Sequence, residues 1–189
     1  MSSIEALMGR RSIPAQYLQE PGPDDAQVAA AAELALRAPD HGRLQPWRYR
    51  LIRGGARARF AELLVQRALA RDPATPAAQL DKLRSRPLQA PLVIALSAQL
   101  RADPKVPEIE QLLAAGAAAM NMLNAFHLQG FGAIWLTGAS AYDAGIASAL
   151  GCHRDERLLG FMYVGSINKQ VPGAVGRAAR APFVEDWRG

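Results

Sequence analysis

Apolar residues recur at two spacings along this chain, and the two spacings predict different elements. Residues 47–53 alternate apolar and basic side chains, which is the pattern of a strand with one buried face. Residues 92–97 are almost continuously apolar, as in a strand buried on both faces. Two further short apolar runs, 131–136 and 158–164, are bounded by polar or glycine-containing segments. The pattern therefore predicts four strands.

Apolar residues at intervals of three and four predict helices around these strands. We expect them at residues 4–8, 24–36, 56–70, 75–84, 108–128 and 143–150. Acidic Asp24 and Asp25 suit the positive end of the second helix, and Thr75 with Pro76 is expected to cap and open the fourth. Strands separated by helices, without internal repeats or a low-complexity linker, predict one three-layer domain, α+β or α/β, over residues 1–189.

The predicted helix 108–128 contains a stretch, 111–128, that has no charged residue and is about as long as a short membrane span. The stretch is rich in alanine, however, and carries Asn121, Asn124 and His127, whereas a lipid-facing helix favours leucine and avoids amides. We therefore expect a helix buried in protein on most sides, and no membrane.

Composition narrows the class of ligand. The 189 residues carry 22 basic and 17 acidic side chains, a net charge of +5, and 50% of the residues are hydrophobic. The arginines are scattered rather than gathered into a stripe with aromatic residues. The charge therefore favours an anionic small ligand over nucleic acid.

The cysteine and histidine content argues against a disulfide framework and against a metal centre. Cys152 is the only cysteine, and the three histidines lack the paired spacing of zinc sites. We interpret Cys152 and His153 as a small buried thiol beside a surface histidine. Residues 1–11 lack the long apolar run of a signal peptide, so a reducing, cytoplasmic location is expected.

Three segments are candidates for ligand contacts. Residues 10–12 (Arg-Arg-Ser) end the first predicted helix with a donor set suited to phosphate. Residues 38–48 form a loop stiffened by two prolines, in which Asp40 is expected to make a local turn hydrogen bond rather than an acid–base pair with His41. Residues 135–138 (Trp-Leu-Thr-Gly) end a predicted strand, where open sheets tend to place ligands. Taken alone, each segment is also explained by a structural role that involves no ligand.

The glycines of Gly130-Phe131-Gly132 do not fit a Rossmann dinucleotide site. That fingerprint runs from a strand through glycines into a helix, whereas the order here is helix, glycines, strand. The glycine pair instead permits a tight helix-to-strand turn and close approach of the backbone to a flat ligand.

Taken together and in order, these segments resemble the nitroreductase family. The matching blocks are Arg10-Arg11-Ser12, Arg37-Ala38-Pro39-Asp40-His41, Gln45-Pro46-Trp47-Arg48 and Gly130-Phe131-Gly132-Ala133-Ile134-Trp135. The resemblance runs from residue 4 to about 165 and is closest to the small, single-domain bacterial NAD(P)H nitroreductases with a shortened substrate region. It implies an α+β three-layer sandwich, with a central, mainly antiparallel sheet flanked by helices. It also implies an intertwined homodimer, formed through the long central helices, with two FMN molecules at the interface.

The resemblance further implies which residues contact the cofactors. The expected FMN contacts, for the phosphate, the ribityl chain and the ring, are Arg10, Arg11, Ser12, Arg37, His41, Gln45, Trp135, Leu136, Thr137 and Gly138. Of these, Arg37 and His41 are expected to act partly from the second subunit, and a backbone N–H near Thr137-Gly138 to meet the flavin N5. The expected contacts for the nicotinamide nucleotide are Ala125, Phe126, His127, Leu128, Gln129 and Gly130.

The implied activity is the reduction of nitro compounds, quinones or similar small acceptors by NADH or NADPH, in a ping-pong cycle through bound FMN. The flavin carries the chemistry, so no side chain is expected to be catalytic and no metal is needed. Basic groups at the N1–C2 carbonyl edge would stabilise the anionic reduced flavin. Two alternatives stay open: another flavin reaction on this scaffold, such as ene reduction or flavin fragmentation, and a non-catalytic basic binding protein.

The chain departs from the family pattern in the loop, at the pocket and near the C-terminus. The asparagine that many larger members carry shortly before Gln45 is absent, and Leu136 stands where close relatives can have a basic residue. The arginine that larger members aim at the phosphate has only Arg177 and Arg180 as candidates.

The C-terminal segment 166–189 has little periodicity but ends with apolar residues. These are Pro182, Phe183 and Trp187. The segment is therefore expected to dock on the partner subunit.

Overall fold

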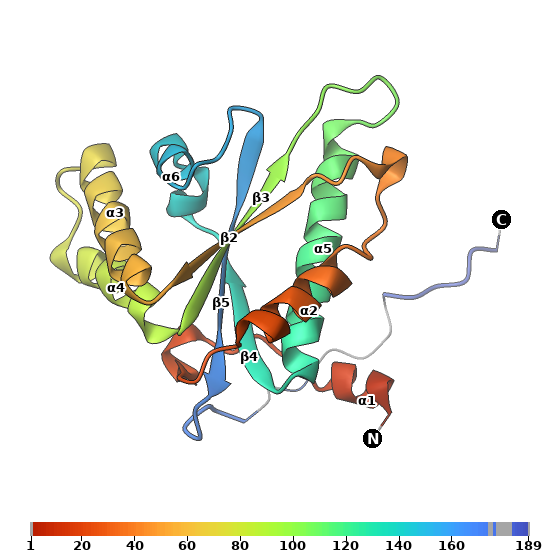
Figure 1. Ribbon diagram of the computed structural model, residues 1–189, viewed down its shortest axis with the longest axis horizontal. Helices are drawn as coiled ribbons and strands as arrows, with labels where there is room; N and C mark the ends of the chain where they lie inside the picture. The colour runs from red at the N-terminus through yellow and green to blue at the C-terminus, as the bar shows by residue number, and fades with distance from the viewer. Residues whose placement is uncertain (1, 174–175, 177–182, 189) are drawn as a thin grey trace.

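The computed structural model describes residues 2–173, 176 and 183–188 of the chain (Figure 1). Its helices are α1 (Ser3–Met8), α2 (Asp25–Ala35), α3 (Gly55–Arg71), α4 (Ala77–Gln89), α5 (Glu108–Leu128) and α6 (Ala144–Ala149). Its strands are β1 (Leu18–Gln19), β2 (Trp47–Arg53), β3 (Leu92–Gln99), β4 (Phe131–Leu136) and β5 (Glu156–Ile167). Three short 3₁₀ turns are η1 (Ala15–Tyr17), η2 (His41–Arg43) and η3 (Ala139–Tyr142).

Every strand pair in this part of the chain is antiparallel. The order is β1-β5-β3-β2, and β4 pairs with β5. In Figure 1, α3, α4 and α6 lie on one side of the sheet, and α2 and α5 lie on the other. The predicted three-layer α+β fold with a mainly antiparallel sheet is therefore confirmed.

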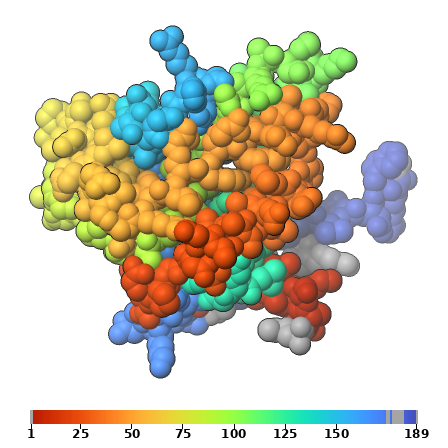
Figure 2. All heavy atoms as spheres, in the orientation of Figure 1, coloured from red at the N-terminus to blue at the C-terminus, as the bar shows by residue number. Residues whose placement is uncertain are grey.

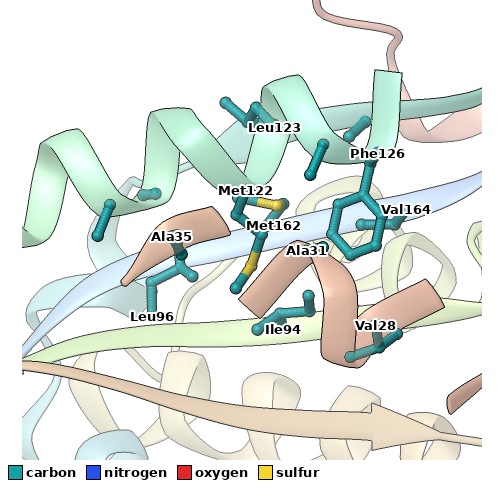
Figure 3. Close-up of a cluster of buried hydrophobic side chains, with 14 of the residues drawn as sticks. Val28, Ala31, Ala35, Ile94, Leu96, Met122, Leu123, Phe126, Met162 and Val164 are labelled. Carbon is teal, nitrogen blue, oxygen red and sulfur yellow. The ribbon is translucent and has the colours of Figure 1, made fainter. Parts of the chain in front are cut away.

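Two apolar clusters, one on each face of the sheet, join the layers. Successive residues of β3 alternate between them: Ile94 and Leu96 face α2 and α5, whereas Val93 and Ala95 face α3 and α4. Figure 3 shows the first cluster, in which Phe126 of α5 packs over the sheet. Phe126 has no exposed surface. The small alanines of α2 and α5 let these helices pack closely.

Several predicted boundaries are confirmed and others are wrong. The strands 47–53 and 131–136 and the helix 108–128 are observed with the bounds predicted. The last strand, predicted at 158–164, extends to Glu156–Ile167 because its charged start pairs with β3 and its end pairs with the two-residue β1. That short strand, β1, was not predicted.

The start and end of α4 also differ from the prediction. The Thr75 hydroxyl donates back to the carbonyl of Asp72 (2.6 Å) instead of capping the helix, and Pro76 occupies the cap position. The helix was predicted to end at residue 84, but it continues through the buried Pro87 to Gln89. Residues 85–89 are therefore helical, which the sequence pattern did not predict.

Helix α5 is buried or half-buried over most of residues 111–128, as predicted, but one apolar face stays exposed in this single chain. Its apolar residues Ile109, Leu113, Met120 and Leu128 are 40–65% exposed. They recur at helical spacing, and we call them the exposed face of α5. Among the described residues, no helix is both long and apolar enough to cross a membrane.

Candidate functional site

The segment after α1 runs along the edge of β4 that faces away from β5. The Ile13 N–H donates to the carbonyl of Ala133 (3.0 Å), and the Ile13 side chain is buried. This contact fixes the preceding residues at the surface, with Arg10 and Arg11 half-buried and Ser12 exposed. The predicted phosphate-binding residues are thus held beside a strand edge.

Arg10 and Arg11 line a hollow of about 110 Å³, which we call the first hollow. Its far side is formed by the last turns of α5, including Leu123 and His127, and by Phe131 at the start of β4. Two guanidinium groups and an imidazole beside apolar side chains suit the phosphate end of an amphipathic ligand.

The first hollow lies at the start of β4, and the other end of this strand has an exposed backbone. Gly138 has φ +93°, a conformation that favours glycine, and both Thr137 and Gly138 are exposed. Beneath them Trp135 donates from Nε1 to the carbonyl of Leu159 (3.1 Å). A Cβ on Gly160 would lie 2.4 Å from the Leu136 carbonyl oxygen, so only glycine allows β5 to pass this closely under the strand end.

A second hollow, of about 300 Å³, opens on the other face of β4. Its apolar floor is Pro14, Ile134 and Leu136, and its rim carries Lys82 and Arg86 of α4. The sequence analysis missed both cations, because α4 was predicted to end before Arg86 and nothing local indicated that the helix lies beside residue 14. Their spacing of four residues on one helix is the signal that was available.

The remaining predicted flavin residues lie at the other end of α5. Asp40 accepts a hydrogen bond from the Gln45 N–H (2.8 Å), which confirms the predicted local turn bond. His41 Nδ1 lies 2.7 Å from Glu110 Oε2 in the first turn of α5, and Arg37 is exposed after the end of α2.

Glu110 and His127 mark the two ends of α5, and therefore the two halves of the predicted site. They are seventeen positions apart, so at the usual helical rise they are separated by about 25 Å. Arg10 and Arg11 lie beside His127, whereas His41 contacts Glu110. One chain thus places Arg10, Arg11 and Ser12 near the start of β4, but it does not bring His41 to them.

The sequence of the whole chain matches that of known proteins. The profile of the Nitroreductase family matches residues 7–166. An Escherichia coli (strain K12) protein named "Putative NAD(P)H nitroreductase YdjA" is 37% identical over 184 residues, which cover 97% of this chain and 98% of the relative. The chain belongs to the nitroreductase family.

Solved structures show the same fold. A nitroreductase-like family protein from Bacillus cereus superposes with a TM-score of 0.85 at 21% identity, covering 100% of this chain and 97% of that one. A variant of the FMN and NADPH-dependent nitroreductase NfnB from sphigopyxis sp. strain HMH superposes with a TM-score of 0.79, also at 21% identity and with full coverage of both chains. The resemblance inferred from the four sequence blocks is confirmed at the level of family and fold.

The donor chemistry of this nitroreductase-family chain fits FMN. Arg10, Arg11 and the Ser12 hydroxyl can hold a phosphate, and the end of β4 offers an exposed apolar and backbone surface to a planar ring. Arg11 also donates to the Gly173 carbonyl (3.1 Å), which ties it to the segment after β5. The two C-terminal candidates Arg177 and Arg180 lie outside the described residues.

The stretch predicted for the nicotinamide nucleotide is mostly engaged within the chain. Ala125 and Phe126 are buried, so their side chains face the core. His127 Nε2 lies 2.8 Å from the carbonyl oxygen of Ala6, and Gln129 donates to the carbonyl of Gln27 (3.1 Å). Leu128 and Gly130 are the exposed members of the set. Contact with the nicotinamide nucleotide therefore stays a prediction. Leu128, Gly130 and the part of His127 that lines the first hollow are accessible for it.

Two groups with shifted pKa values, Cys152 and Glu156, line neither hollow. Burial raises the pKa of the Cys152 thiol, which agrees with an unreactive, half-buried cysteine beside the exposed His153. Burial would also raise the pKa of Glu156, but hydrogen bonds from Arg50, Ser97 and the His153 N–H outweigh it and lower that pKa to about 2. Among the described residues, no cluster of three or more metal-ligating side chains is found.

Proposed function

We propose that this nitroreductase-family chain is an FMN-dependent oxidoreductase that uses NADH or NADPH to reduce nitro compounds, quinones or similar small acceptors. The observation that carries the proposal is the cationic first hollow at the start of β4, a strand whose other end exposes the backbone of Thr137 and Gly138; these suit the phosphate and the ring of one extended FMN molecule. The names of two relatives support it, since one is called an NAD(P)H nitroreductase and the other FMN and NADPH-dependent.

The working form that we propose is a homodimer that holds each flavin between two subunits. The exposed face of α5 carries apolar side chains from Ile109 to Leu128, with the half-buried Asn121 and Asn124 among them, and Gly116 and Ala117 also lie half-buried within it, so a second helix can approach closely. If two α5 helices pack antiparallel about a twofold axis, the first half of one helix lies beside the last half of the other. This brings His41 and Arg37 of the second subunit toward Arg10 of the first, and it removes the 25 Å gap.

The C-terminal segment supports the same assembly. Figure 2 shows the last described residues, coloured deep blue, standing away from the body of the chain. Phe183 is 74% exposed and Trp187 is 93% exposed. Because large aromatic side chains gain from burial, we propose that this segment docks on the second subunit.

FMN, when bound, supplies the hydride chemistry, and the residues of the chain bind and orient it. Arg10, Arg11 and Ser12 hold the phosphate by charge-assisted hydrogen bonds. The backbone at Thr137 and Gly138 lines the ring. With FMN bound, NAD(P)H and the acceptor would bind in turn, in a ping-pong sequence.

The absorption spectrum of the purified protein tests this function. We expect the bands of oxidised flavin, which should bleach when NADH or NADPH is added without oxygen and return when a quinone or a nitroaromatic compound is added. FMN content that is unchanged after many turnovers would separate this activity from flavin-fragmenting chemistry. A colourless protein that does not take up FMN, or a bound flavin that neither nicotinamide bleaches, would contradict the proposal.

A further inference from the structure

A third hollow, of about 250 Å³, lies between α6 and the start of β5 (Figure 1). Strand β4 pairs with β5 only from Phe161 onward, and residues of η3 lie beside the earlier part of β5 instead. The hollow has an apolar floor formed by Ala141, Ala147 and Leu158, and it is also lined by Tyr142, which is 82% exposed. An exposed aromatic ring beside an apolar floor suits a planar, apolar ligand.

Two buried carboxylates reach this third hollow, but they do not make it acidic. Glu156 is bound by Arg50 at both oxygens, and Asp143 is bound by Arg67 (2.9 Å) and by Arg71. Both carboxylate side chains are at most 2% exposed. Three arginine charges therefore surround two carboxylate charges, and the excess positive charge favours an anionic ligand over a cationic one.

Arg157 supplies a cation at the hollow itself. It is exposed, and its partner is Glu108, at 3.4 Å between Nη2 and Oε2, with the two side chains 56% and 62% exposed. Ion pairs as exposed as this one contribute little to stability, so the guanidinium can turn to a ligand at small cost. A guanidinium binds a carboxylate through two parallel hydrogen bonds. The third hollow therefore fits an aromatic ring that carries an acidic group.

The hollow also lies near the position that we expect for the flavin N5. Gly138 precedes η3, and its carbonyl accepts a hydrogen bond from the Ala141 N–H (2.9 Å). Four residues of 3₁₀ helix advance by about 8 Å, so Tyr142 lies about that far from the Gly138 backbone. We propose that the third hollow binds the electron acceptor, and that Tyr142 and Arg157 select aromatic acceptors with a carboxylate or a similar anionic group. This inference rests on the proposed function.

The contact with Arg157 is expected to act on binding rather than on the chemical step. When a nitro group is reduced, a hydride that comes from NAD(P)H through FMN and a proton from water convert it to a nitroso group and water. The carboxylate of the acceptor takes no part in this conversion. Losing its contact with Arg157 therefore raises the KM and leaves kcat unchanged.

The test compares 4-nitrobenzoate with nitrobenzene as acceptors of the full chain with FMN bound. Arg157→Gln should raise the KM for 4-nitrobenzoate about tenfold, the usual effect of losing a hydrogen bond between charged groups, and change the KM for nitrobenzene by less than about twofold. Tyr142→Ala should raise the KM for both acceptors about fivefold, because each loses the stacked ring. Tyr142→Phe keeps the ring and should behave as the wild type.

Arg154→Gln is the matched control, because it removes an exposed arginine just before β5 that does not line the third hollow. It should leave both KM values unchanged. A second measurement uses benzoate, which the enzyme cannot reduce. Benzoate should shift the absorption bands of the bound flavin in the wild type, and its Kd from this shift should rise about tenfold in Arg157→Gln.

The inference is overturned if Arg157→Gln raises the KM of both acceptors equally or of neither. It is also overturned if benzoate binds without shifting the flavin bands, since the hollow would then be an anion site remote from the cofactor. A wild-type protein that takes up no FMN, or whose flavin neither nicotinamide bleaches, would overturn the proposed function and this inference with it. Normal bleaching and turnover without the selective effect of Arg157→Gln would overturn the inference alone.

Discussion

Replacing both Leu113 and Met120 with glutamate is expected to convert the protein to a monomer that no longer retains FMN. Both side chains lie on the exposed face of α5, at 65% and 40% exposure, where they face solvent in a single chain. In the proposed dimer each change would bury a carboxylate without a partner, at a cost of several kcal/mol. Two buried, unpaired carboxylates on each subunit cost more free energy than the packing of two helices supplies. Sedimentation or light scattering reports the mass, and the flavin absorbance of the same sample reports occupancy.

A matched control places the same two charges on the opposite layer. Leu69 of α3 and Leu88 of α4 are 37% and 50% exposed, and their glutamate variants should remain dimeric and yellow. A Leu113→Glu, Met120→Glu protein that stays dimeric would show that another surface forms the dimer. A folded monomer that keeps its flavin at wild-type affinity would show that one subunit holds the whole site.

Replacing Arg50 with methionine is expected to lower the free energy of unfolding by about 3–5 kcal/mol, the usual cost of leaving a buried charge without its partner. Arg50 donates to both carboxylate oxygens of Glu156, at 2.8 and 2.9 Å, and the Glu156 side chain is only 1% exposed. Ser97 also donates to that carboxylate (2.8 Å) but carries no charge. Urea unfolding at a fixed protein concentration measures the loss.

The lowered pKa of Glu156 determines how this difference in stability changes with pH. The pKa of Glu156 is lowered from 4.5 to about 2 in the folded chain, so the contribution of the pair is full above pH 4.5 and is lost as the pH falls toward 2. The difference between wild type and Arg50→Met should shrink over that range. Removing the exposed ion pair with Arg84→Met should cost less than about 1 kcal/mol. An equally small loss for Arg50→Met would contradict a buried ion pair.

Local patterns predicted the parts of the fold that are set by local physics. The strand Trp47–Arg53 was predicted because its alternation matches one buried face, and α5 because its helical periodicity ends at the turn before Gly130. The end of α4 was not predicted, because Pro87 is normally a stop signal and only its burial against the fold shows why the helix continues. The strand β1 is two residues long and exists only through pairing with β5.

The residues of the candidate site likewise fall into those that local sequence predicted and those that only the fold brings together. The residues at 10–12 and 135–138 were found because each forms a block in sequence and each ends or borders a predicted element. The contact between His41 and Glu110 joins residues 69 positions apart, and the second hollow joins Pro14 to Lys82. Such contacts arise from the packing of layers, so the chain must fold before they exist. The separation of the two halves of the site along α5 likewise became visible only in three dimensions.

The central claim is that each flavin is held by both subunits, and a mixed dimer tests it directly. One chain carries Arg10→Ala with Ser12→Ala, and the other carries Arg37→Ala with His41→Ala. If residues from both subunits build each site, the mixed dimer contains one site with all four changes and one site with none. Two different affinity tags allow its purification, and a fluorescence titration measures bound FMN.

We predict that each parent homodimer loses FMN at concentrations that saturate the wild type, and that the mixed dimer binds one FMN per dimer within about twofold of the wild-type Kd. Recovery of a native site from two defective chains requires that each contributes its intact half. A mixed dimer that binds FMN no better than its parents would contradict a site shared between subunits.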